Sequence, residues 1–343
     1  MSSAIASNDE RNIEARFFSR FLNRFGVYFI AIILLGLGLL LQATGLIGNF
    51  VSPQNLLNIV NAVALLGIVA VGMGFVTYSG HYADLSIPTT MALSGIVAVE
   101  FLRFGFLPAM IAALLVGMLV GVINGIAIGK FKANPIIWTL AMSYVTMGMI
   151  RFIWVNRQIY PDVITSNEQA VTLFDNIYRF RLFDVIGMPV ILLLIVVVVG
   201  QLILARTPFG AQLKLTGSAR RVARFTGVKV ERMIGTAFVI SAVCAVIGGL
   251  AVTSLSRVGA WYNGEGYDFR AVTAVVLGGM TLAGGRGTVI GVLGGTLVIG
   301  LMNNIMTLLG IGTFSQDMIR GLVFIIVVAI NAQSLRSMGR DDA

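Results

Sequence analysis

The sequence contains few of the residues from which disulfide frameworks and most enzyme sites are built. Its 343 residues include one cysteine and one histidine, and only 11% of them are charged. The single Cys244 excludes an internal disulfide framework and a cysteine-rich metal site. The single His81 excludes a histidine metal cluster and a relay of histidines, although one histidine can still act alone as a base. We therefore expect no catalytic residues, no bound metal and no cofactor in this chain.

Hydrophobic residues make up 57% of the chain and gather in long runs, which indicates an integral membrane protein. A hydrocarbon core of roughly 30 Å requires about 20 apolar residues in each helix that crosses it. The runs predict an all-α polytopic fold with ten transmembrane helices, at residues 27–47, 56–78, 85–102, 107–129, 136–154, 185–205, 233–255, 269–285, 287–309 and 317–334.

Lysines and arginines are unevenly distributed between the loops that join these spans. If the N-terminus is cytoplasmic, 16 of them lie on the cytoplasmic side and five on the opposite side. This excess predicts cytoplasmic N- and C-termini by the positive-inside rule. The expected organisation is a cytoplasmic tail at 1–26, a transmembrane domain at 27–334 with a cytoplasmic loop at 206–232, and a second tail at 335–343. The net charge of +9 then reflects orientation beside anionic lipid and not nucleic-acid binding.

Two polar breaks precede the third and the eighth predicted span. The first break, residues 80–84, reads Gly-His-Tyr-Ala-Asp, and the second break, residues 264–268, reads Gly-Glu-Gly-Tyr-Asp. With ten spans these elements run in opposite directions, which predicts two inverted five-span halves, as in many transporters. Backbone that is not helical at membrane depth must be buried in protein or face water. The candidate residues of a translocation pathway are therefore His81, Tyr82, Asp84, Ser86 and Asp268.

Each of these residues also has a structural interpretation. Asp84 or Ser86 can cap the helix that follows the first break, and His81 can be a satisfied polar residue. Asp268 can form an ion pair with Arg257 or Arg270. We expect two further ion pairs, Glu100 with Arg103 and Asp317 with Arg320, from their spacing of three residues. Close helix packing accounts for the regularly spaced glycines 117, 121, 125 and 129 and for glycines 287, 291 and 295.

The loop at 206–232, called the basic loop below, carries seven lysines and arginines. Gly217 and Gly227 bracket about two helical turns, with Ser218 placed to cap them. That short helix would present Arg220, Arg221 and Arg224 on one side and apolar residues on the other. The loop is a candidate docking site for a partner protein, and the alternative is a solvated loop that touches lipid.

Three segments of the chain resemble the membrane-spanning subunits of bacterial ABC importers for simple sugars, the ribose and galactose permease family. They are Asp84-Leu85-Ser86, the basic loop from Phe209 to Val228, and the run from Ala271 to Gly287, AVTAVVLGGMTLAGGRG, which is the most specific. The resemblance covers about Pro53 to Asn331. The chain departs from the family at His81 and Tyr82 in the first break and at Ala219, where members commonly have asparagine.

The resemblance implies a fold like that of the vitamin B12 and branched-chain amino acid permeases. It also implies a permease dimer, homomeric or heteromeric, in the bacterial inner membrane. Each subunit would contact a cytoplasmic ATPase through the basic loop, at Gly217, Ser218, Arg220, Arg221, Arg224 and Gly227. A periplasmic binding protein would deliver a monosaccharide or similar small polar solute, and ATP would bind to the ATPase. The hypothesis for the mechanism is alternating access, driven by movement of the loop helix.

The sequence gives no sign of nucleotide hydrolysis by this chain itself. Asn124 stands where a phosphate-binding loop ending at Lys130 would need its first glycine, and Phe131 replaces the required serine or threonine. An ion-coupled secondary transporter remains the alternative function, but such proteins place ionisable residues within their spans, whereas here they lie almost wholly at the ends. A membrane enzyme would need a cluster of acids or histidines facing one cavity.

Overall fold

The computed structural model of the protein describes residues 26–81, 83–155, 157–183 and 185–338. Within these residues, eight helical segments are long and apolar enough to cross a membrane. They are Gly26–Ala43, α2 (Pro53–Tyr78), Ile87–Phe104, α4 (Phe106–Gly129), α5 (Pro135–Ile153), α8 (Met188–Arg206), α11 (Val230–Ser256) and α13 (Val289–Leu308). The segment Ile87–Phe104 consists of α3 (Ile87–Phe101) and the 3₁₀ helix η1 (Leu102–Phe104). The chain is therefore a polytopic all-α protein.

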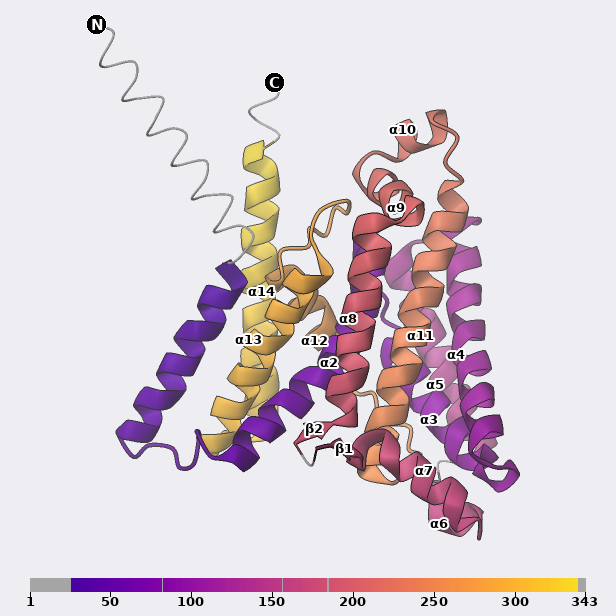
Figure 1. The fold of residues 1–343 in the computed structure, drawn as a ribbon. Helices are drawn as coiled ribbons and strands as arrows, with labels where there is room; N and C mark the ends of the chain where they lie inside the picture. Colours follow the sequence, from indigo (N-terminus) through magenta and orange to yellow (C-terminus); the bar gives the residue numbers. More distant parts are fainter. Residues whose placement is uncertain (1–25, 82, 156, 184, 339–343) are drawn as a thin grey trace, which may run out of the picture.

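The remaining elements are shorter or more polar. They are α6 (Pro161–Ile164), α7 (Glu168–Arg179), the strands β1 (Arg181–Leu182) and β2 (Ile186–Gly187), α9 (Pro208–Ser218), α10 (Arg220–Phe225), α12 (Tyr267–Leu277) and α14 (Thr313–Met338). The strands pair antiparallel in a minimal hairpin. Figure 1 shows α9 and α10 at one end of the helix bundle and α6 and α7 at the opposite end.

Several helices begin at a polar residue followed by proline. The side chains of Ser52, Asn134 and Thr207 each accept hydrogen bonds from backbone N–H groups in the first turn of α2, α5 and α9. The proline that follows each cap fits the first helical position, because its missing N–H has no partner there in any case. These pairs of residues fix the places where the chain turns back into the bundle.

One predicted span was too long. The apolar run predicted a helix at 269–285, but α12 ends at Leu277 and the chain turns at Gly278. Gly279, Gly284, Gly285 and Gly287 all have φ between +70° and +119°, a backbone region that glycine enters without steric cost. The segment after Leu277 is therefore a compact glycine turn. The last predicted span, 317–334, lies within α14.

Helix α2 lies at the centre of the bundle and α11 packs along it, whereas the first helix and α5 lie at the periphery. Of the residues in the most apolar stretch of α2, 83% are buried, compared with 17% of those in Gly26–Ala43 and in α5. Helices α4 and α11 approach closely because the regularly spaced glycines of α4 face α11. A Cβ atom added at Gly125 would lie 2.7 Å from the Cα of Gly235, and one at Gly121 would lie 2.7 Å from the Cβ of Ala242. The packing interpretation is confirmed for the four regularly spaced glycines of α4, called the glycine stripe below, and for Gly291 and Gly295 of α13. It is wrong for Gly287, which lies in the turn before α13 with φ of 119°.

Both predicted ion pairs with a spacing of three residues also form. Arg103 lies 2.6 Å from Glu100, and Arg320 pairs with Asp317.

The glycine stripe gives a test of this packing. Replacing Gly125 by leucine should destabilise the protein by about 1–3 kcal/mol or more, because the new side chain meets the backbone of α11, which yields less than a flexible side chain. Gly148 in α5 is the matched control, since a Cβ there meets nothing within 4 Å. Thermal unfolding in detergent should show a large loss of melting temperature for Gly125→Leu only. Equal melting temperatures for the two variants would contradict this packing.

Candidate functional site

Three segments that are far apart in the sequence meet at one point beside the end of α2. They are the first break at Gly80, the end of α9 at Gly217, and the glycine turn at Gly284 and Gly285. A Cβ added at Gly217 would lie 2.6 Å from the nitrogen of Gly285, and one at Gly284 would lie 2.6 Å from the nitrogen of Gly80. No side chain fits at these positions without displacing backbone. We call these four residues the glycine junction.

A backbone hydrogen bond joins these segments in addition to their van der Waals contact. The N–H of Gly285 donates a hydrogen bond of 2.9 Å to the carbonyl of Tyr78, the last residue of α2. Gly80 and Gly284 have φ of 83° and 89°, a backbone region that strongly favours glycine. The glycine junction therefore ties the basic loop, the first break and the segment after α12 into one unit.

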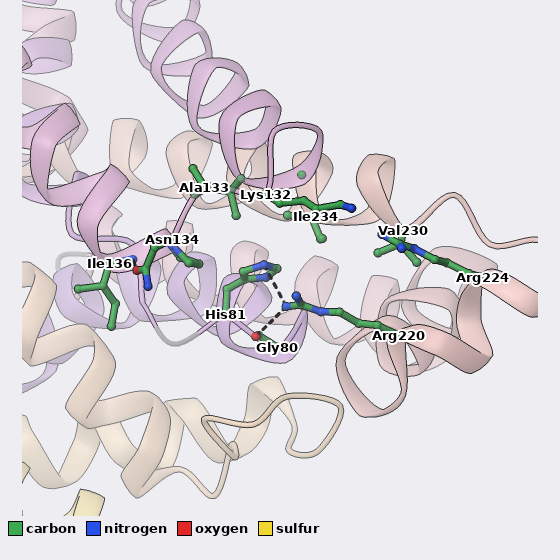
Figure 2. Close-up of a pocket in the computed structure, with 13 residues that line it drawn as sticks. Gly80, His81, Lys132, Ala133, Asn134, Ile136, Arg220, Arg224, Val230 and Ile234 are labelled. Atoms are coloured by element: carbon green, nitrogen blue, oxygen red, sulfur yellow. Dashed lines mark hydrogen bonds between the residues drawn. The ribbon is translucent and has the colours of Figure 1, made fainter.

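Arg220 extends from α10 back to the first break (Figure 2). One of its Nη atoms donates to the carbonyl oxygen of Gly80 at 3.0 Å and lies 3.0 Å from Nε2 of His81. Nδ1 of His81 lies 2.8 Å from Oγ of Ser79, which donates to the carbonyl of Val76 at 2.7 Å. A guanidinium only donates, so Nε2 of His81 accepts and Nδ1 carries the proton.

Burial and the charge of Arg220 lower the pKa of His81 from 6.5 to about 3, so its ring is neutral at physiological pH. The pKa of Arg220 is lowered too, first by desolvation and then by the neighbouring Arg224. Both effects arise because the basic loop holds cationic side chains against a buried segment. The neutral ring is the form that can accept the hydrogen bond from Arg220.

A cavity of about 440 Å³ opens beside this contact, between the first break, the turn before α5 and the basic loop (Figure 2). Its polar lining residues are His81, Lys132, Asn134, Arg220 and Arg224. The N-terminus of α5 lies at its edge, capped by Asn134. The cavity is therefore basic and faces the same end of the bundle as α10.

The three arginines of α10 point to different partners. Arg220 contacts the first break, Arg221 lies 5.8 Å from the ring centroid of Phe225, and Arg224 forms an ion pair of 3.2 Å with Glu231. Val222 and Phe225 are 49% and 80% exposed. The outer face of α10, defined by Arg221, Val222 and Phe225, is thus a mixed apolar and basic surface, whereas the Arg220 guanidinium turns back to the first break.

The predicted two-turn helix between Gly217 and Gly227 forms as α10, but its predicted cap is wrong. Ser218 is the last residue of α9, and its hydroxyl donates to the carbonyl of Lys214 at 2.8 Å. The residue before α10 is Ala219, which has no side-chain acceptor. Ser218 instead packs directly against Gly285, and the helices meet at a sharp bend. Gly227 follows α10 with φ of 80°.

Asp84 and Ser86 are buried at the start of α3 and take part in one hydrogen-bond network. Asp84 Oδ1 accepts from the N–H and the hydroxyl of Ser86, at 3.0 Å and 2.6 Å. Its Oδ2 accepts from Ser241 of α11 at 3.2 Å. Ser86 in turn accepts from Asn124 of α4, which accepts from Trp138 of α5. The network fixes the first break against three helices.

The sequence interpretation missed Asn124, Trp138 and Ser241, which complete this network. Asn124 had a visible signal, because it is an amide within the apolar run that carries the glycine stripe, and a polar group inside a span needs a partner. Ser241 has no such signal, since one serine in an apolar helix commonly bonds to its own backbone.

Asp268 is the second residue of α12 and is partly buried. Its charge lies within electrostatic reach of the Asp84 carboxyl group. The alternative of an ion pair with Arg257 or Arg270 is wrong. Arg257 pairs with Asp162 and Asp175 at 3.3 Å and 3.0 Å, and among the described residues no ion pair joins Asp268 to Arg270. Tyr82 lies outside the described residues.

Residues 55–328 match the protein family described as the branched-chain amino acid transport system permease component. The chain belongs to this family. It is a membrane-spanning permease subunit of an ABC importer, and the match runs from α2 into α14, so it contains the glycine junction, the basic loop and both breaks.

Three named relatives of the permease are themselves sugar import proteins. The chain is 34% identical over 290 residues to the ribose import permease protein RbsC of Bacillus subtilis, covering 82% of this chain and 86% of that protein. It is 30% identical to the L-arabinose ABC transporter permease protein AraH of Azospirillum brasilense, over 90% and 87% of the two chains. It is also 30% identical to the fructose import permease protein FrcC of Rhizobium meliloti, over 88% and 84%. No solved structure matches the chain.

The resemblance noted from the sequence is thereby confirmed at the level of the family. Permease subunits of ABC importers are not enzymes, and no group of three histidine, cysteine, aspartate or glutamate residues in the described ranges could hold a metal ion.

Replacing Asp84 tests the buried network in the permease. Asp84→Ala leaves the Ser86 and Ser241 hydroxyls without their acceptor, and each buried group left unpaired costs roughly 1–3 kcal/mol. Asp84→Asn retains one carbonyl oxygen and should unfold at a temperature between those of wild type and the alanine variant. Differential scanning fluorimetry in detergent measures the order, and an alanine variant as stable as wild type would exclude the network from the fold.

The neutral His81 predicts how stability depends on pH. The pKa of His81 is about 3 in the folded protein and 6.5 in the unfolded chain. As the pH falls below 6.5, His81 therefore binds a proton in the unfolded chain but not in the folded permease. The contribution of His81 to the free energy of unfolding is thus constant above pH 7 and declines toward pH 5.

The matched variant His81→Gln, which lacks this titration, should lose less melting temperature between pH 7 and pH 5 than wild type does. The same loss in both proteins would contradict the assignment of His81 as a buried neutral acceptor.

Proposed function

We propose that this permease subunit carries a monosaccharide or a similar small polar solute inward. The observation that carries the proposal is its identity of 30–34% with import permeases for ribose, L-arabinose and fructose over more than four fifths of the chain. Membership of an ABC importer family favours this function over an ion-coupled secondary transporter. ATP would bind and be hydrolysed in a separate ATPase subunit.

The proposed assembly contains two permease subunits, homomeric or heteromeric, two cytoplasmic ATPases and a periplasmic binding protein. We propose a bacterial inner-membrane location with both termini in the cytoplasm, which the excess of lysine and arginine on that side supports. Figure 1 supports this orientation, because the start of the first helix, the end of α14 and the basic loop lie at one end of the bundle.

Ten crossings would result if α12 and α14 are added to the eight apolar segments. The spans would form two inverted five-span halves, arranged as in the vitamin B12 permease. The chain would then consist of a cytoplasmic tail at 1–26, a transmembrane domain at 27–334 and a second cytoplasmic tail at 335–343. The short helices α3 and α12 support the inverted relation, since each follows a polar break.

The basic loop would couple ATP hydrolysis to movement of the first break. Its outer face, Arg221, Val222 and Phe225, would contact the ATPase. Its inner contact, Arg220 with Gly80 and His81, would transmit the motion together with the glycine junction. A junction of backbone against backbone has no flexible side chains to absorb a displacement, so the loop and the break would move together during alternating access.

His81, Asp84 and Ser86 would then position the break that borders the pathway, and Asp268 would do so for the second break. This role fits their burial, because the Asp84 carboxylate already has a donor at each oxygen and holds Ser86 in place.

The two faces of α10 should be separable by mutation. Arg221→Glu with Phe225→Ala should abolish recovery of the ATPase with the permease in a mild-detergent pull-down, because the outer face loses its apolar and basic groups. Arg220→Gln should retain the ATPase but lose most uptake, because only the inner contact is broken. Lys229→Glu, an exposed charge change in the same loop, is the control. Loss of ATPase from Arg220→Gln, or retention by the double variant, would contradict this division.

Uptake by the complete importer in proteoliposomes tests the proposed function itself. Uptake of labelled ribose, L-arabinose or fructose should require ATP and the binding protein and should not change when proton and sodium gradients are collapsed. Uptake that continues without ATP and stops with the ion gradient would identify a secondary transporter.

A further inference from the structure

A second and larger cavity, of about 770 Å³, lies between α12, α13 and α14. This volume is within the range of roughly 300–1,000 Å³ that small-molecule sites occupy. The cavity is formed by the first turns of α12 and the first half of α14. Neither Asp84 nor Ser86 lines it.

The lining combines aromatic rings with fixed guanidinium groups. Phe269 and Phe324 stand edge to face with their ring centroids 6.0 Å apart. Arg320 donates to Asn303 at 2.9 Å and to Gln316 at 2.7 Å, and it also pairs with Asp317. These partners hold the Arg320 side chain in one orientation before any solute binds.

Arg270, on the α12 side of the cavity, has N–H donors from which no group of the described residues accepts. Among the described residues it donates one hydrogen bond, of 3.2 Å, to the carbonyl of Glu265, and its guanidinium lies 5.3 Å from the ring centroid of Tyr267. A guanidinium has five N–H donors, so several remain for a ligand. Arg270 is also close enough to Arg320 for the two positive charges to repel.

This wall does not suit contact with lipid tails. Ionisable side chains within membrane segments face a protein interior or a water-filled route, because exposing them to hydrocarbon is unfavourable. Glu265, Arg270, Asp317 and Arg320 gather around this one cavity. The α12–α14 surface is therefore expected to border water, a polar solute or another protein surface.

We propose that the transported solute first binds in this cavity, and that the solute is a neutral, polyhydroxylated ring the size of a monosaccharide. The apolar face of such a ring fits against Phe269 and Phe324. Its hydroxyl and ring oxygens accept from Arg270, and its hydroxyls donate to the carboxylate of Asp317. The proposal rests on the proposed function, and it names the residues that touch the solute in place of the buried network at the first break.

Gly321 gives a test that leaves the fold intact. It lines the cavity, and a Cβ added there meets nothing within 4 Å. Gly321→Trp should fill the cavity and lower ATP-driven monosaccharide uptake by the reconstituted importer at least ten-fold. Gly148→Trp, an equally open glycine of α5 outside the cavity, should transport at the wild-type rate.

Uptake by the wild type tests the proposed function separately from this cavity. If the wild type transports, unchanged uptake by Gly321→Trp overturns the cavity proposal and leaves the function standing.

Labelling provides a readout that does not depend on transport. Gly321→Cys in a Cys244→Ala background should react with a charged thiol reagent in the assembled importer, and the transported monosaccharide should slow that reaction. A reaction rate that the sugar leaves unchanged would overturn the proposal, as would a short crosslinker that joins two copies at residue 321, because the cavity would then be an interface between subunits.

Discussion

The fold of this permease depends on the direct contact of three backbone segments that carry no side chains where they meet. At the glycine junction, Gly217 of the basic loop lies against Gly80 and the turn at Gly284 and Gly285. Such contact allows no rearrangement of rotamers, so a displacement of one segment is transferred to the others. The same turn ends α12 early and brings the chain back toward α2. One local constraint thus shortens a helix and connects the proposed ATPase contact to the first break.

Polar groups are added around this contact in two layers. Next to it, Arg220, His81 and Ser79 form a chain of donors and acceptors in which only neutral His81 can take part. Deeper in the bundle, Asp84 and its partners hold the start of α3 against α4 and α11. In the deeper layer the Asp84 carboxylate is buried and has a donor at each oxygen, so it is not directed toward a solute. A small polar solute would instead meet the aromatic and arginine surface between α12 and α14.

The apolar runs predicted the all-α membrane fold and most helix positions, because hydrophobic length is a property of local sequence. The helix starts at Ser52, Asn134 and Thr207, each followed by proline, also follow a local rule, although the predicted spans did not use it. The end of α12 could not be read in this way, since Met280, Leu282 and Ala283 are apolar enough to continue a helix and the glycine turn forms against distant segments. The inward direction of Arg220 was also beyond the sequence. Neighbouring arginines at 220, 221 and 224 look equivalent until the bend at Ala219 gives each a different partner.

The central claim is that the basic loop and the first break move as one body. Its most direct test is an electron cryomicroscopy structure of the complete importer in nucleotide-free and ATP-bound states, from which the distances between the Cα atoms of Gly80, Gly217 and Gly284 are measured. We predict that these three distances stay the same in both states while the basic loop shifts relative to α5. Separation of Gly217 from Gly80 on ATP binding would contradict the account.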